Sequence, residues 1–196
     1  MTVPAWIDEL EPAAPDIVTA WRGIDEGRFL SVRREVRRRS GEGTALRTIE
    51  QLAATATALR GIVESLPEPA FVLPGGEGDW NVAEAVGHVA SARAGLVLAA
   101  VLAAADRWPA DAPTVVPGVP GPPAAGRDQL VAKIDKSQRL IERRAGVIDG
   151  HELDACPLEH PLVGRLRCGE WLLFAGVHDL MHLEQLHDLS AALAEQ

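Results

Sequence analysis

Apolar residues recur along much of this chain at alternating spacings of three and four, which is the period of one face of an α-helix. The most regular run lies between residues 44 and 66 and stops at Pro67. Its apolar positions are Ile49, Leu52, Ala56, Leu59, Val63 and Leu66. A stripe of this kind faces the interior of a helical bundle, so we expect this segment to be a core helix and nothing more.

Three further long helices are expected in the C-terminal part of the chain, at residues 80–106, 127–148 and 169–194. The first of them opens with Asn81 and, three residues later, Glu84, which is the pattern of a capping box. Residues 149–168 have no regular pattern, and no segment alternates apolar and polar residues over a length that would build a sheet. We therefore expect an all-α fold, a four-helix bundle with an extra N-terminal helix.

The N-terminal residues lie outside this bundle pattern. Prolines mark residues 1–15 as an irregular lead, and a helix is expected over residues 16–39. The apolar stripe of that helix includes Trp21, Ile24 and Phe29, which need burial either on the bundle or across a two-fold interface. We divide the chain into an N-terminal extension with a helix, residues 1–43, and a helical bundle, residues 44–196.

Length and composition narrow the class of protein. A chain of 196 residues suits one domain with a sizeable core, and 47% hydrophobic but only 4% aromatic residues favour helices with small, closely packed side chains. The net charge of −9 argues against a general nucleic-acid binder, which needs a basic surface.

No stretch approaches a membrane-spanning length without charges, and the N-terminus lacks the pattern of a signal peptide. We expect a soluble, cytoplasmic protein whose partners include neither nucleic acid nor membrane.

Two segments have both a functional and a structural interpretation. Residues 33–39 contain five arginines and could form an anion or partner site, but we favour a solvated face whose cations suit a helix C-terminus. Residues 109–126 contain six prolines and form either a functional cover or a plain crossover between distant helix ends. Cys156 and Cys168 lack CxxC spacing, so neither a disulfide framework nor a thiolate zinc site is indicated.

Histidines carry the candidate chemistry. His178 and His182 lie four residues apart on one face of the last helix, in the polar centre of a seam whose ends are apolar. Two unpaired imidazoles in a core cost free energy, and a metal ion is the first candidate to satisfy them. His88 lies on the seam of the 80–106 helix, among small side chains that leave room for an ion. We predict that these three histidines bind one divalent ion, with the open position that is typical of a catalytic site.

Three segments resemble the DinB-like superfamily of metal-binding four-helix bundles, and the likeness extends over about residues 44–196. They are residues 80–88, residues 160–164 leading into 170–171, and residues 178–185. The resemblance implies a divalent ion, commonly zinc or nickel, on the three histidines, with water at the open positions. It also implies a homodimer. Similar proteins include S-transferases that use mycothiol or bacillithiol, and mycothiol-dependent maleylpyruvate isomerases.

Other polar residues near the histidines have alternative roles. Glu84 is the leading candidate for the general base of a hydrolysis, although we favour its role in the capping box. Gln185 either orients a ligand or is a core residue satisfied by a neighbouring helix. Asp179 and Glu184 point away from the ligand face, and we expect them to be solvated or to support the ligands. We assign no site role to three further histidines: His151, His160 and His187.

Three functions remain open. The first is a metal-dependent enzyme that transfers a low-molecular-weight thiol, or hydrolyses a bond, on a small molecule. The second is a non-catalytic, metal-stabilised bundle that binds a small molecule or a protein partner. In the third, the three histidines simply share buried waters. A cysteine-based mechanism is disfavoured because neither cysteine falls on the histidine seam.

Overall fold

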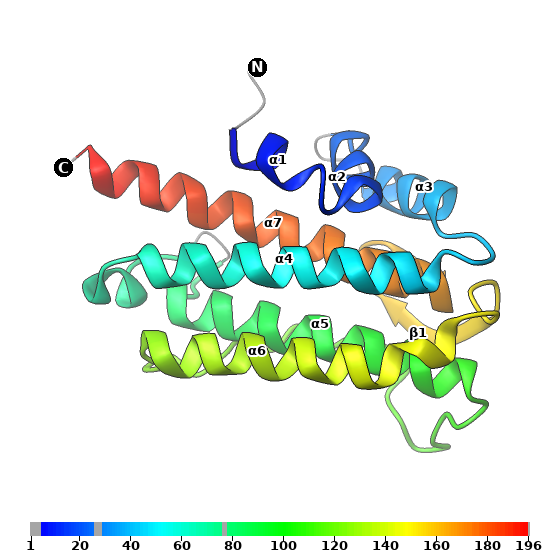
Figure 1. Ribbon diagram of the computed structural model, residues 1–196. Coiled ribbons are helices and arrows are strands. Elements are labelled where there is room, and N and C mark those ends of the chain that lie inside the picture. Colours follow the sequence, from blue (N-terminus) through cyan, green and yellow to red (C-terminus); the bar gives the residue numbers. More distant parts are fainter. Residues whose placement is uncertain (1–4, 26–28, 76–77, 196) are drawn as a thin grey trace.

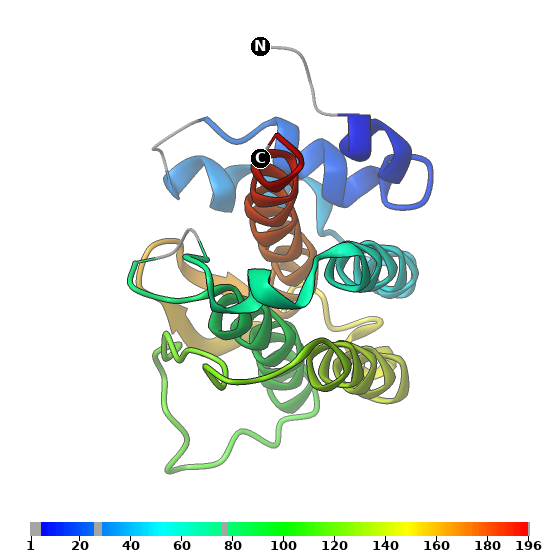
Figure 2. The same ribbon diagram turned by 90° about the vertical axis from the view of Figure 1, so that its left-hand side faces the viewer.

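The computed structural model describes residues 5–25, 29–75 and 78–195, and its main feature is a bundle of four long helices (Figure 1). They are α4 (Ala45–Ser65), α5 (Val82–Ala104), α6 (Arg127–Arg144) and α7 (Cys168–Ala194). Both α4 and α5 pack against α6 and α7, so the four helices form a ring when viewed from the end (Figure 2). Short 3₁₀ helices follow α4 and α6, namely η1 (Glu68–Val72) and η2 (Ala145–Ile148). The predicted all-α bundle is confirmed, with helix ends close to the predicted ones.

The N-terminal part of the chain differs from the prediction. Three short helices, α1 (Ala5–Leu10), α2 (Pro15–Arg22) and α3 (Phe29–Arg39), replace the irregular lead and the single helix (Figure 1). They pack on α4 and α7 outside the bundle. After α2 the chain turns at Gly23, where a Cβ atom would lie only 2.6 Å from Oε2 of Glu35 on α3. Because Gly23 has no side chain, the end of α2 can lie against Glu35 of α3. One continuous helix could not fold back on itself in this way.

The apolar residues of this extension pack on the bundle. Ile17 of α2 is fully buried against Gly176 of α7, where a Cβ atom would come within 2.3 Å of the Ile17 side chain. Trp21 and Ile24 are partly buried against the same core. The side chain of Phe29 lies outside the described part of the chain.

A β-hairpin occupies the segment that was expected to be irregular. Strands β1 (Ala155–His160) and β2 (Gly164–Arg167) pair antiparallel, with His160 opposite Gly164 and an irregularity in β1. Gly164 has φ +74°, a conformation that favours glycine at the turn. Cys156 and Leu158 of β1 face inward on either side of exposed Pro157, so burial does alternate, but over too few residues and with a proline in the strand for the sequence to show it. The hairpin places His160 beside the N-terminal half of α7.

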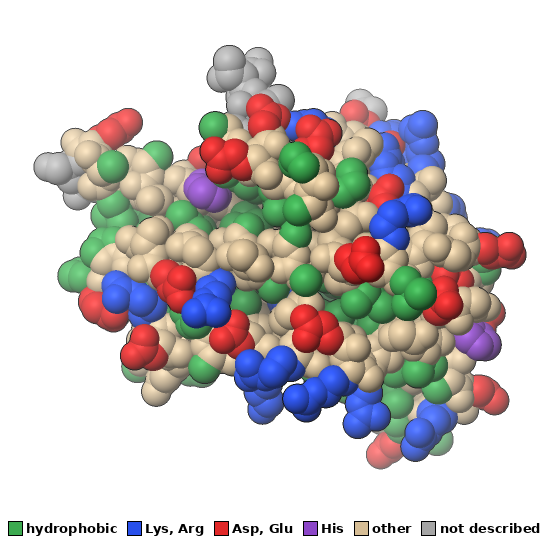
Figure 3. Space-filling model, viewed as in Figure 1, with side chains coloured by type: hydrophobic (Ala, Val, Ile, Leu, Met, Phe, Trp, Pro, Cys, Tyr) green, Lys and Arg blue, Asp and Glu red, His purple; other side chains and the backbone are tan. Residues whose placement is uncertain are grey.

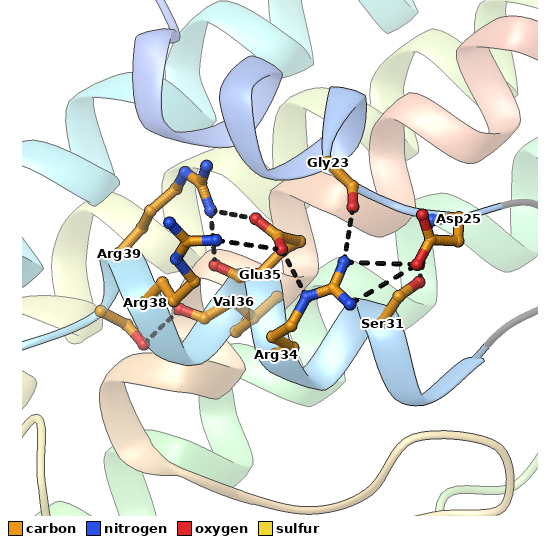
Figure 4. Close-up of polar contacts among 9 residues, drawn as sticks. Gly23, Asp25, Ser31, Arg34, Glu35, Val36, Arg38 and Arg39 are labelled. Atoms are coloured by element: carbon orange, nitrogen blue, oxygen red, sulfur yellow. Dashed lines mark hydrogen bonds and ion pairs between the residues drawn. The ribbon is translucent and has the colours of Figure 1, made fainter.

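The arginine-rich segment lies on α3, and most of its charges are paired within the chain (Figure 4). Buried Glu35 accepts hydrogen bonds from Arg34 (2.7 Å) and Arg39 (2.6 Å), and Arg38 lies 3.6 Å away. The hydrogen bond from Arg34, supported by Arg39, lowers the pKa of Glu35 although burial opposes it. Arg37 forms a bidentate pair with buried Glu170 of α7, at 2.7 and 3.2 Å. The pair of Arg37 with Glu170 attaches α3 to the bundle, and together these pairs leave few of the arginines for an external anion.

One buried ion pair joins all four bundle helices. Arg93 of α5 and Asp179 of α7 are both fully buried, with Nε 3.0 Å from Oδ2. Thr55 of α4 donates to the same carboxylate at 2.6 Å, and the Arg93 guanidinium also donates to Ser137 and Gln138 of α6. Asp179 is thus a core residue, and the expectation that it would be solvated is wrong.

The helix α5 is long and apolar enough to cross a membrane by length and composition alone. Most of that apolar surface is buried inside the bundle, as in the core helix of a soluble protein. The outer faces of α4 and α6 carry charges of both signs (Figure 3). Among them, Arg60 of α4 pairs with Glu64 at 2.9 Å and with Asp135 of α6 at 3.8 Å.

Candidate metal centre

Three imidazoles converge between α5 and α7. One nitrogen from each of His88, His178 and His182 can be chosen so that all lie within 4.8 Å of one another. The ring centroid of His88 is 5.3 Å from that of His178 and 5.5 Å from that of His182. The two rings on α7 are 4.7 Å apart, since residues four apart share a helix face. The structure thus brings together the three histidines that the sequence singled out, in a group that could hold a metal ion.

The ring of His88 is oriented by the proline-rich connection. Its Nδ1 lies 2.9 Å from the carbonyl oxygen of Val119. Because a carbonyl oxygen only accepts, Nδ1 must donate, and the lone pair of the neutral ring is then on Nε2. Metal-ligating histidines usually donate their second N–H to a carbonyl or carboxylate in this way.

The same connection is held against α5 by backbone contacts. The Gly121 amide donates to the Glu84 carbonyl at 2.9 Å, and the Asn81 side chain donates to the Pro123 carbonyl at 3.0 Å. A Cβ atom on Gly121 would lie 2.5 Å from the Cα atom of Gly87, so the two backbones meet where neither residue has a side chain. Of the two interpretations of this segment, the structure supports a cover that takes part in the site.

Burial keeps the two α7 imidazoles neutral. Desolvation, followed by the charges of neighbouring histidines, lowers the pKa of His178 well below its usual value. Burial, followed by the charge of His88, lowers the pKa of His182 to about 4. The neutral ring is the form that binds a metal ion. In addition, Nδ1 of His178 is buried without a hydrogen-bond partner among the described residues, which is costly unless an ion or another ligand satisfies it. The residues present therefore fit a divalent metal ion.

The histidines open onto a cavity of about 390 Å³, here called the histidine cavity. Its walls include Phe174 and Met181 of α7, Pro117 of the proline-rich connection, and His160 at the end of β1. The His160 ring packs edge-on against Phe174 at 5.4 Å, and burial, followed by the charge of His88, lowers its pKa. The sequence interpretation, which gave His160 no site role, missed this residue. The signal was present, because His160 begins one of the three segments that resemble DinB-like proteins.

The remaining candidates lie as follows. Glu84 forms the capping box with Asn81, each side chain bonding the other's backbone amide at 2.9 Å, and it does not line the histidine cavity. Gln185 does line it, and its side chain interacts with that of His182. His151 pairs with Asp154 on the surface, and His187 stacks on Trp6. The structure thus places Gln185 beside His182 and engages Glu84 in the capping box.

The fold and the site define the chain as a helical bundle with three inward-facing histidines that could hold a metal ion beside a cavity. The family model of the DinB superfamily matches residues 51–186, which is more than half of the chain, so the protein belongs to the DinB superfamily. No curated protein matches the chain significantly, and no solved structure does.

Proposed function

We propose that His88, His178 and His182 hold one divalent ion, zinc or nickel, and that the protein is an enzyme acting on a small molecule in the histidine cavity. The observation that carries this proposal is the convergence of three imidazoles, one nitrogen of each within 4.8 Å of the others, on the wall of that cavity. Three histidine ligands leave an open coordination position, which is the arrangement of catalytic rather than structural zinc sites.

A divalent ion at this site would supply a Lewis acid that polarises a bound group or keeps a thiol in its thiolate form. The chain contributes the rest. The Val119 carbonyl orients the His88 ring, Gln185 lies beside His182, and Phe174 and Met181 give the cavity an apolar wall.

Of the two reactions considered, we favour thiol transfer over hydrolysis. The carboxylate that the sequence offered as the general base of a hydrolysis is Glu84. Among the described residues, no Asp or Glu lines the histidine cavity, and Glu84 is engaged in the capping box. A thiol needs only to lose its proton to become a nucleophile, so this site suits a low-molecular-weight thiol such as mycothiol or bacillithiol as cosubstrate.

Metal analysis of the purified protein tests the site. The wild type should carry about one equivalent of zinc or nickel, and His182→Ala should carry none. His151→Ala is the matched control, because His151 is exposed and paired with Asp154, and it should retain the metal. One equivalent of metal in a His178→Ala, His182→Ala double variant would place the site elsewhere.

A panel of low-molecular-weight thiols with electrophilic acceptors tests the reaction. Thiol consumption should require the bound metal and should disappear in His182→Ala. A protein that holds one metal ion but consumes no thiol and hydrolyses no test substrate would instead be the non-catalytic, metal-stabilised bundle.

A further inference from the structure

A second cavity, of about 380 Å³, continues from the histidine cavity along α5. The two cavities share five lining residues, which are His88, Ala92, Leu96, Val116 and Pro117. Away from this junction the second cavity is lined by Gly95, Leu98, Ala99 and Leu102 of α5 and by Trp108 and Pro113 of the proline-rich connection, and it is open to solvent on one side. We call it the apolar arm. It extends along α5 from His88 to Leu102, a rise of about 21 Å at 1.5 Å per residue.

The wall formed by the connection is fixed by hydrogen bonds. The Glu159 amide of β1 donates to the Thr114 carbonyl at 2.7 Å, and the Val116 amide donates to the Glu159 carbonyl at 2.9 Å. Together with the contacts of Val119 and Gly121 on α5, these bonds hold the segment at both ends of the shared junction. The arm is therefore a built part of the site, of a volume usual for ligand pockets.

The chemistry of the walls selects a kind of ligand. Among the described residues, those that line the histidine cavity or the apolar arm include no Lys, Arg, Asp or Glu. A carboxylate or phosphate group in the arm would lose its hydration without gaining a counter-charge, which is costly. A hydrocarbon group gains about fourfold in affinity for each methylene that it buries.

We propose that the small molecule bound by this protein is neutral and carries a hydrocarbon portion, which occupies the apolar arm and leaves the reacting group beside His88. The placement of the reacting group beside His88 rests on the proposed function. The placement of the hydrocarbon portion in the apolar arm does not. In the transfer reaction this apolar molecule would be an electrophile such as an activated alkene: the thiol sulfur would bond to one alkene carbon, and the electron pair of the broken π bond would take the thiol proton at the other.

Calorimetric titration with 1-butanol, 1-hexanol and 1-octanol tests the arm on protein freed of metal by a chelator. Affinity should rise about fourfold with each added methylene. Octanoate should bind more weakly than 1-octanol. Equal affinities along the alcohol series, or tighter binding of octanoate, would overturn the proposal.

A bulky side chain placed in the apolar arm should remove the dependence of affinity on the chain length of the alcohol. Ala99→Phe, on the buried wall, should weaken 1-octanol binding at least tenfold, and Leu98→Trp gives an independent variant at a partly exposed rim position, in case Ala99→Phe does not fold. Ala191→Phe, on the exposed C-terminal end of α7, is the matched control and should bind as the wild type does. Unchanged 1-octanol binding in a folded arm variant would overturn the proposal.

The outcome is separable from that of the metal proposal. If the purified protein holds no metal but the alcohols still bind with the expected chain-length dependence, the apolar arm stands and the metal-dependent function fails. If metal binds but chain length has no effect, the metal site stands and the apolar ligand is refuted.

Discussion

At the scale of single residues, the neutral imidazoles make the stability of the metal-free protein depend on pH. The pKa of His182 is lowered to about 4 in the folded protein, and that of His178 is lowered well below its usual value. Between pH 6.5 and about 4 the unfolded chain therefore binds more protons than the folded one, and stability falls as the pH falls. Urea unfolding of metal-free protein across this range should show a decreasing free energy of unfolding.

A variant isolates the contribution of one ring. His182→Gln removes a group that binds a proton near pH 6.5 in the unfolded chain but only near pH 4 in the folded one. The loss of stability between pH 6.5 and 4 should therefore be smaller in this variant than in the wild type. An identical pH dependence in wild type and His182→Gln would show that His182 does not titrate as burial requires.

The site and core residues that the sequence predicted are defined by local spacing, whereas those it missed are defined by contacts between distant elements. His178 and His182 were found because their spacing of four is a local property of one helix. Arg93 was missed, because nothing near it in the sequence indicates that its partners come from three other helices. His160 was missed because its place in the cavity depends on a hairpin rather than on a periodic pattern.

At the scale of secondary-structure elements, the proline-rich connection should control metal affinity. A Cβ atom on Gly121 would lie 2.5 Å from Gly87 Cα and 2.9 Å from the Glu84 carbonyl oxygen, both backbone atoms. Gly121→Ala should therefore displace the connection and remove the Val119 carbonyl from His88. Loss of such a supporting contact typically costs 10–100-fold in metal affinity, and we expect a loss of about that size.

Competition with a chelator of known affinity measures this effect. Gly126→Ala is the matched control, because it lies at the end of the same connection and a Cβ atom there would meet nothing within 4 Å. Its metal affinity should equal that of the wild type. Equal affinity in Gly121→Ala would mean that the Val119 contact does not support the site.

The sequence predicted the long helices better than the short elements. The four bundle helices each bury a stripe several turns long, so periodicity defines them. The break between α2 and α3 depends on the contact of Gly23 with Glu35, and the hairpin depends on two inward residues and a pairing across its turn. Such features are set by tertiary contacts, which a pattern of spacing does not contain.

At the scale of the whole molecule, association is the next prediction. Trp21 and Ile24 are partly buried against the core of the same chain, which weakens one of the two arguments for a dimer. The resemblance to DinB-like proteins still implies a homodimer, and we expect one at micromolar concentration. Light scattering should give twice the mass of one chain. A monomer at that concentration would contradict the prediction and would show that the N-terminal helices complete the fold alone.

The buried pair of Arg93 and Asp179 contacts all four bundle helices, and it carries the last prediction. Burial raises the pKa of the Asp179 carboxyl, while Arg93 and Thr55 oppose that shift, so the carboxylate depends on its partners. Asp179→Asn leaves the Arg93 charge buried and uncompensated, and should destabilise the metal-free protein by about 3–5 kcal/mol in urea unfolding at pH 7.

Glu64→Gln makes the same chemical change in an exposed pair with Arg60, and should cost less than about 1 kcal/mol. Replacing both partners with apolar residues, Arg93→Met with Asp179→Leu, should recover most of the loss, because the uncompensated charge is then gone. A double variant no more stable than Asp179→Asn would show that the polar network itself, rather than the balance of its charges, holds the bundle together.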